Sequence, residues 1–264
     1  MGQILVAAGQ PVENLTRAVQ VIEKAAAGGC HVVVLPECLD FGWSDPSAVG
    51  RAQTIPGPHS DQLCSAAREN GIWVVAGLVE ACDGRLYNTA LLISPAGDIS
   101  RKHRKINELA LALDLYSLGT SVAVADTELG RVGLAVCADN FPDSPEIGGA
   151  LGRMGCRLLL SPCSWAVDGD HDNEAQPYGA IWRESYKALT SKFPMTIVAV
   201  STVGWLTGGP WKGRKCIGCS MAVGPGGAML AEAPYGVDAE ALVVVEVELG
   251  EAPTSVSAVA ASRV

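Results

Sequence analysis

Residues 130–142 read GRVGLAVCADNFP, and the character of the chain changes abruptly within them. Arg131 to Val136 is a short, largely apolar run, which is typical of a buried β-strand. The next tripeptide of note, Ser144-Pro145-Glu146, combines an N-cap residue, a first-turn proline and an acidic residue, which together open a helix. We therefore expect a strand, a turn and a helix in succession, with Cys137 at the turn.

Two other reactive or charged side chains end predicted strands. His31 to Leu35 is a continuous apolar run, and Pro36 ends it because proline cannot donate to a strand ladder. Glu37 therefore follows the end of one strand, and Lys105 closes another. Folds of the α/β type commonly gather their chemistry at strand ends, so we expect Glu37, Lys105 and Cys137 to converge.

The rest of the chain mixes helices and strands. Residues 12–27 place apolar side chains on one helical face and end at two glycines, as an amphipathic helix does. No linker or change of composition divides the chain. We therefore expect one domain, residues 1–264, with an α/β (α+β) fold of two mixed β-sheets packed face to face and helices outside. The other predicted elements are helices over residues 61–70 and 178–192 and strands over residues 72–80, 86–93, 157–160, 195–203, 217–223 and 241–247.

The composition excludes several classes of partner. The chain has 264 residues, 48% of them hydrophobic and 18% charged, which is enough for a sizeable core. A net charge of −9 argues against nucleic acid, because binding phosphates requires clustered cations. No apolar run reaches the roughly twenty residues of a membrane helix, and the start MGQILVAAGQ does not resemble a secretory leader. We expect no membrane partner and a cytoplasmic location.

The nine cysteines are an odd number spread through apolar segments, as expected of reduced thiols rather than disulfides. Cys216 and Cys219 have the spacing of a zinc-binding pair, but no second pair or nearby histidine completes a tetrahedral site. His171 lies in an acidic loop and also lacks a second histidine at ligand spacing. We expect no metal and no cofactor.

The three strand-end residues suit one kind of chemistry. Cleaving an amide with a thiol requires a base, a cation or N–H group for the oxyanion, and an acid for the departing amine. Glu37, Lys105 and Cys137 supply these functions, and the backbone N–H of Ala138 follows the nucleophile at the turn. Each residue alone has an ordinary reading, as a loop carboxylate, part of a solvated basic run or a buried structural thiol.

Taken together and in order, Leu35-Pro36-Glu37, Arg104-Lys105 and Gly133 to Asp139 resemble the motifs of the nitrilase superfamily of carbon-nitrogen hydrolases. The resemblance implies a four-layer α-β-β-α sandwich. It also implies that Glu37 takes the proton of Cys137, whose sulfur attacks the substrate carbonyl. In the same scheme Lys105 and Ala138 N–H hold the oxyanion, and water activated by Glu37 hydrolyses the thioester. Members of the superfamily are usually homodimers or larger homo-oligomers.

The sequence departs from the superfamily pattern in ways that bear on the substrate. Counting back from a downstream glycine, Asp114 takes the place of the second glutamate, with Glu108 as a competitor that is closer to Lys105 than usual. Asn140 stands near where carbamoylase relatives carry an arginine that binds a carboxylate, so a free carboxylate on the substrate is disfavoured. Trp165 follows the next strand and is either a pocket wall or a packing residue.

We therefore expect a hydrolase of non-peptide C–N bonds that acts on a small-molecule linear amide or an N-carbamoyl amine. An acyltransferase would use the same acyl-enzyme, and a silent scaffold would keep the fold without the chemistry. Ala138 and Asp139 replace the tryptophan and glutamate of true nitrilases, so nitrile hydrolysis ranks below amide hydrolysis. The glycine-rich loop Trp205 to Lys215 is either an active-site cover or a surface loop. The apolar tail Ala252 to Val264 is a candidate for packing on a neighbouring subunit.

Overall fold

The computed structural model describes residues 1–249. Its largest sheet has six strands in the order β14-β13-β10-β8-β7-β6. The pairs β7–β8 and β8–β10 are parallel and the others are antiparallel, so the sheet is mixed. Its strands are β6 (Val124–Thr127), β7 (Gly130–Leu134), β8 (Leu158–Cys163), β10 (Thr196–Ser201), β13 (Met221–Gly224) and β14 (Ala228–Glu232).

A second mixed sheet has four strands in the order β2-β3-β4-β5, with β2 and β3 parallel. Its strands are β2 (Val32–Val34), β3 (Trp73–Cys82), β4 (Arg85–Ile93) and β5 (Ile99–Arg104). Two small sheets accompany the main ones. They contain β1 (Gly2–Gln3) with β15 (Ala241–Leu242), and β11 (Val203–Trp205), β12 (Lys215–Ile217) and β9 (Ala166–Val167).

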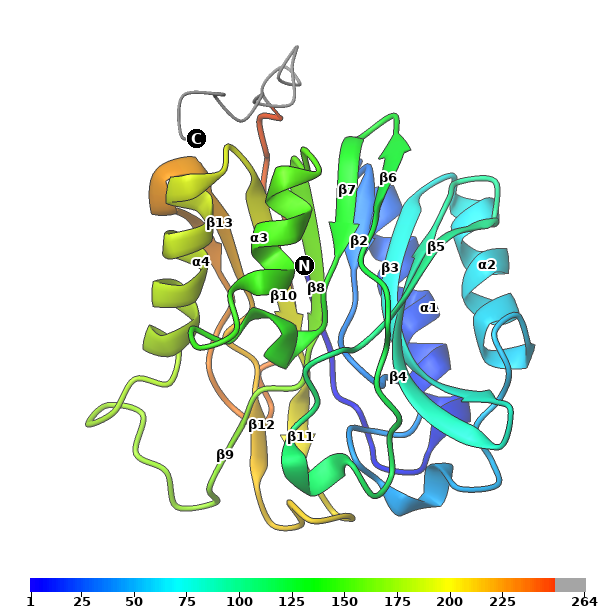
Figure 1. Ribbon diagram of the computed structural model, residues 1–264. Helices are drawn as coiled ribbons and strands as arrows, with labels where there is room; N and C mark the ends of the chain where they lie inside the picture. Colours follow the sequence, from blue (N-terminus) through cyan, green and yellow to red (C-terminus); the bar gives the residue numbers. More distant parts are fainter. Residues whose placement is uncertain (250–264) are drawn as a thin grey trace, which may run out of the picture.

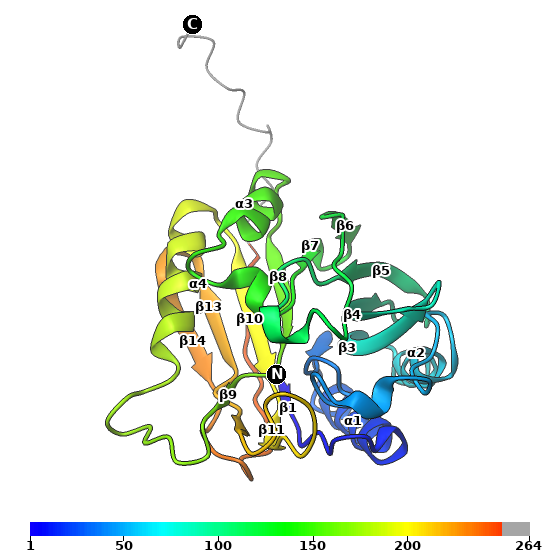
Figure 2. The same cartoon turned by 60° about the horizontal axis from the view of Figure 1, so that its bottom comes forward.

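Helices cover the outer faces of the two main sheets (Figure 1). Helices α1 (Pro11–Ala27) and α2 (Pro58–Asn70) lie against the four-stranded sheet, and α3 (Glu146–Arg153) and α4 (Ala180–Lys192) lie against the six-stranded one. The layers therefore run α-β-β-α, which confirms the predicted sandwich, and Figure 2 shows the same arrangement from another side.

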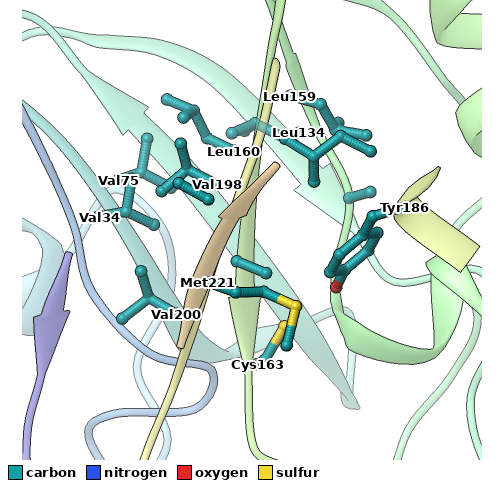
Figure 3. Packing of buried hydrophobic residues seen from close by; sticks show 14 of the residues in the cluster. Val34, Val75, Leu134, Leu159, Leu160, Cys163, Tyr186, Val198, Val200 and Met221 are labelled. Carbon is teal, nitrogen blue, oxygen red and sulfur yellow. The ribbon is translucent and has the colours of Figure 1, made fainter. Parts of the chain in front are cut away.

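The apolar patterns of the sequence explain these layers. Helix α1 buries Leu15, Ala18, Ile22 and Ala25, which recur every three or four residues and so share one helical face. Between the sheets, Val34 and Val75 lie beside Leu160 and Val198, whereas Leu159 and Tyr186 pack on the outer side of β8 (Figure 3). Strand β8 is therefore buried on both faces, as its continuous apolar run predicts.

Three predicted strands differ from those observed. The run 217–223 is interrupted because Gly218 and Cys219 have φ values of 67° and 57°, which no β-strand accommodates. The run 241–247 pairs only as Ala241–Leu242. A further predicted strand, 195–203, divides into β10 and β11 at Thr202.

Short 3₁₀ helices fill connections at Pro46–Ala48, Ala110–Ala112, Cys137–Asn140 and Pro225–Gly227. The third of these, η3, is separated from the end of β7 by two residues, and its first residue is the predicted nucleophile, Cys137. A strand followed by a tight turn thus holds Cys137, in agreement with the sequence pattern.

Candidate active site

Three strand ends bring Glu37, Lys105 and Cys137 into one buried region. The Lys105 ammonium donates a hydrogen bond of 2.8 Å to Glu37 Oε1, and both side chains are almost fully buried. Cys137 is 9% exposed, and the charges of Glu37 and Lys105 both act on its thiol. The structure therefore brings Glu37 and Lys105 into direct contact, with Cys137 near enough for both charges to act on its thiol.

Glu37 is held by a close approach between neighbouring strands. Gly77 of β3 lies so near the segment after β2 that an added Cβ would sit 2.6 Å from Glu37 Cα. Asn88 Nδ2 donates to Glu37 Oε1 at 2.6 Å, so Asn88 and Lys105 share that oxygen. Within residues 1–249, Glu37 Oε2 has no hydrogen-bond partner. One carboxylate oxygen is thus fixed, and the other remains available as a base.

Burial and neighbouring charges set the protonation of this pair. Burial raises the pKa of Glu37 above its ordinary value, although Lys105 opposes this shift. Burial alone would lower the pKa of Lys105, but the carboxylates of Glu37 and Glu108 hold it well above its ordinary value. Lys105 therefore stays cationic, and Glu37 is a stronger base than an exposed carboxylate.

Cys137 occupies a sharp backbone turn. Its φ is 60°, a left-handed conformation that costs a non-glycine residue roughly 1 kcal/mol or more. A hydrogen bond with Cys163, burial and the nearby Glu37 raise the pKa of the Cys137 thiol well above its ordinary value, while Lys105 opposes them. The resting thiol is therefore protonated, and nucleophilic attack requires a base beside it.

Asp139 connects the turn of Cys137 to the segment that carries Lys105. Its Oδ2 accepts hydrogen bonds from Val136 N at 2.9 Å and His103 Nε2 at 2.7 Å. Its Oδ1 accepts from the backbone N–H groups of Ile106 and Asn107 at 3.0 and 2.8 Å. Burial raises the pKa of Asp139, but the contacts with His103 and with the backbone N–H groups together outweigh burial and leave the pKa below its ordinary value. A charged Asp139 thus fixes the two sheets to each other at the site.

Comparison with known proteins agrees with this geometry. Residues 2–253 match the family described as carbon-nitrogen hydrolase. The chain belongs to the carbon-nitrogen hydrolase family. It is an enzyme that hydrolyses C–N bonds.

Relatives and solved structures support the assignment of this hydrolase. It is 30% identical to the omega-amidase NIT2 of Xenopus tropicalis over 84% of its own length and 79% of that protein. It is also 30% identical to the human omega-amidase NIT2, over 90% and 83% of the two chains. Its fold resembles that of an amidase from Nesterenkonia sp. AN1, with a TM-score of 0.78 and 21% identity over 94% and 91% of the chains.

Of the two candidates for a second acid in the hydrolase site, Glu108 contacts Lys105 and Asp114 lies apart from it. Glu108 Oε1 accepts from Lys105 Nζ at 2.9 Å and from Trp43 Nε1 at 3.1 Å, and its Oε2 accepts from Asn88 at 3.3 Å. Asp114 is exposed, beyond the short helix Ala110–Ala112. The chain turns back immediately after Lys105, so the carboxylate of Glu108, only three residues further along, reaches the Lys105 ammonium.

Two other predicted site residues lie on the turn of Cys137, and Trp165 lies in an aromatic stack. Ala138 is buried on the same turn, directly after Cys137. Asn140 Nδ2 donates to Ser161 Oγ at 3.1 Å, and its Oδ1 has no partner among the described residues. Trp165 stacks on Trp182 with ring centroids 4.8 Å apart. The tryptophan is therefore part of a buried aromatic stack next to the site.

The loop Trp205 to Lys215 contacts the site through two tryptophans. Trp211 packs on Trp43 with ring centroids 4.7 Å apart, and Trp43 donates to Glu108. In the described part of the chain, no group of three or more His, Cys, Asp or Glu side chains is arranged to hold a metal ion. Nor is any helix of residues 1–249 long and apolar enough to cross a membrane.

Sequence reasoning assigned no supporting role to Asn88, Trp43 or Asp139, although Asp139 belongs to the motif around Cys137. Asn88 carried the clearest signal, because it is a polar residue inside the otherwise apolar run of β4. Trp43 and Asp139 act through contacts with residues far along the chain, which no local pattern records.

Proposed function

We propose that this hydrolase is an amidase that cleaves small linear amides through a thioester formed on Cys137. The observation that carries the proposal is the buried ammonium of Lys105, bonded to both Glu37 and Glu108 beside the thiol. A cation fixed in a water-poor site stabilises a developing oxyanion far better than one in solvent.

The first half of the reaction forms the acyl-enzyme. Glu37 Oε2 takes the proton of the Cys137 thiol as the sulfur attacks the amide carbon. The carbonyl oxygen becomes an oxyanion, held by the Lys105 ammonium and the N–H of Ala138. Glu37 then gives the proton to the amide nitrogen, the C–N bond breaks, and ammonia leaves a thioester on Cys137.

The second half restores the enzyme. Glu37 removes a proton from water, and the hydroxide attacks the thioester carbon. The C–S bond breaks, the acid product leaves, and the sulfur regains its proton from Glu37. Glu108 keeps Lys105 aimed at the oxyanion and orients the water, because it bonds the ammonium at 2.9 Å.

The substrate acyl group is uncharged near the reacting carbon. Asn140 stands where an arginine would bind a carboxylate, and it cannot replace the bidentate contact of a guanidinium. The relatives bear the name omega-amidase, which supports a primary amide over an N-carbamoyl amine or a nitrile.

Ammonia release from a panel of primary amides, N-carbamoyl amines and nitriles tests the proposal. We expect turnover of primary amides without an added acceptor, and loss of turnover in Cys137→Ala with an unchanged fold. Turnover that requires an added amine would favour acyl transfer instead. Near wild-type activity in Cys137→Ala would reject the mechanism.

We further infer a cytoplasmic protein in which residues 1–264 form one catalytic domain and two or more copies associate. All nine cysteines are free, which suits a reducing compartment. The tail Ala252 to Val264, suggested from the sequence as a subunit contact, lies outside the described residues. Light scattering on the purified chain would test the association.

A further inference from the structure

A second thiol lies beside the nucleophile. Strands β7 and β8 are parallel with Leu134 opposite Leu160, and the hydrogen bond from Ala135 N to Leu160 O extends this pairing. Cys137 begins the turn η3 just beyond this pairing, and Cys163 is the last residue of β8, which η3 contacts. Adjacent strands lie about 4.8 Å apart, so the turn that follows β7 lies beside the end of β8.

Independent contacts tie Cys163 to the same site. Its carbonyl oxygen accepts a hydrogen bond from Glu37 N at 3.2 Å. Its sulfur lies 3.5 Å from Ser161 Oγ, which in turn accepts from Asn140 on the turn of Cys137. Cys163 is also near enough to Cys137 to raise the pKa of its thiol. The catalytic turn and the end of β8 are thus linked through Asn140 and Ser161.

We propose that Cys137 and Cys163 form a hydroperoxide-sensitive dithiol site, in which Cys137 is oxidised first and Cys163 then closes an intramolecular disulfide. The proposal rests on the proposed role of Cys137 as the reactive thiol. It adds a modification site to the hydrolase and assigns a function to Cys163, which amide hydrolysis does not use.

The chemistry needs only a hydroperoxide and the two thiols. Glu37 removes the proton of Cys137, and the thiolate attacks one oxygen of hydrogen peroxide. The O–O bond breaks, Cys137 becomes a sulfenic acid, and the released hydroxide takes a proton to give water. The Cys163 sulfur then attacks the Cys137 sulfur, and a second water leaves as the S–S bond forms. One peroxide thus accepts two electrons from the pair.

The positions of the two residues suit this bond. A disulfide joins Cα atoms roughly 4.4–6.8 Å apart, and the spacing of adjacent strands falls within that range. The disulfide would block the nucleophile but would also protect it, because a sulfenic acid left alone proceeds to irreversible sulfinic acid. A thiol reductant returns both sulfurs to the active state.

Peroxide treatment of the purified full-length chain tests the site. The readouts are intact mass, mapping of the linked peptides and amide turnover before and after dithiothreitol. We expect the wild-type protein to lose two hydrogens, to yield a peptide pair joined at Cys137 and Cys163, and to regain most of its activity on reduction. The mass measurement does not depend on turnover, so it separates this proposal from that of amide hydrolysis.

Variants Cys163→Ala and Cys163→Ser, each compared with its own untreated activity, should inactivate irreversibly and accumulate sulfinic acid on Cys137. Cys156→Ala is the matched control, because Cys156 is buried in the same core but approaches Gly133 near the middle of β7. It should behave as the wild type does. Recovery of either Cys163 variant by dithiothreitol, or a wild-type chain that forms sulfinic acid without the linked peptide pair, would overturn the proposal.

Discussion

Replacing Lys105 with methionine probes the charge balance of the active site most directly. The variant Lys105→Met keeps a long side chain but leaves Glu37 and Glu108, both buried, without their shared cation. Removing one partner of a buried ion pair costs about 3–5 kcal/mol, which is a large part of the roughly 5–15 kcal/mol that holds a domain folded. Loss of the oxyanion contact should also lower kcat by about 10²–10³-fold.

The stability loss should depend on pH with a defined sign. In the variant, burial and mutual repulsion raise the pKa of at least one of the two carboxyls above its unfolded value of about 4.3. The folded state then binds more protons than the unfolded state. The free energy of unfolding therefore falls as pH rises from the pKa of that carboxyl in the unfolded chain to its raised pKa in the folded variant. Urea unfolding between roughly pH 5 and pH 8 should therefore show the variant approaching the wild type in acid.

Lys102→Met is the matched control. Lys102 lies on β5 and bonds a buried carboxylate, Glu80, at 2.6 Å, but its side chain is 34% exposed and Arg104 bonds the same carboxylate. We expect at most about 1 kcal/mol of destabilisation and an unchanged kcat. A Lys105→Met protein that unfolds like the wild type at every pH, or that keeps its kcat within tenfold, would refute the reasoning.

Two further predictions concern the carboxylates of the site. Glu108→Gln should lower kcat for ammonia release by roughly 10-fold or more because the ammonium loses a charged partner, whereas Asp114→Asn, on the surface, should leave kcat unchanged; equal effects would restore Asp114 as the second acid. Gly77→Ala should destabilise the fold by about 1–3 kcal/mol and lower kcat, because the new Cβ would displace Glu37. Thermal unfolding measures this loss. The control is Gly149→Ala, in helix α3 with open space around it, which should stabilise the fold by about 0.5–1 kcal/mol. A Gly77→Ala enzyme of wild-type kcat and stability would show that the close approach is unimportant.

The sequence was most informative where a local pattern decides the geometry. The apolar runs before Glu37 and Cys137, and the strand before Lys105, predicted that all three residues end strands, and the layers follow from the same periodicity. The outline of the sandwich was therefore accessible without coordinates.

The sequence did not predict the positions of residues in connections between strands, because these depend on the path that the backbone takes. Glu108 reaches the ammonium only because the chain turns back after Lys105, and spacing along the sequence favoured Asp114 instead. Likewise, the run 217–223 looks apolar throughout, yet its middle adopts left-handed backbone angles that end the pairing. Such turns are decided by contacts between distant segments rather than by composition.

The four hydrogen bonds of Asp139 have a consequence for how the enzyme would tolerate change. Three of them join the cation's segment on one sheet to the nucleophile's turn on the other, so relative slippage of the sheets cannot alter the spacing of the reacting groups without breaking several bonds at once. Mutations in the outer helices should therefore reduce how many molecules are correctly folded while each folded molecule keeps its full turnover rate. Mutations in the outer helices would lower the yield of folded enzyme, whereas mutations between the sheets at the site would lower the turnover rate of each folded molecule.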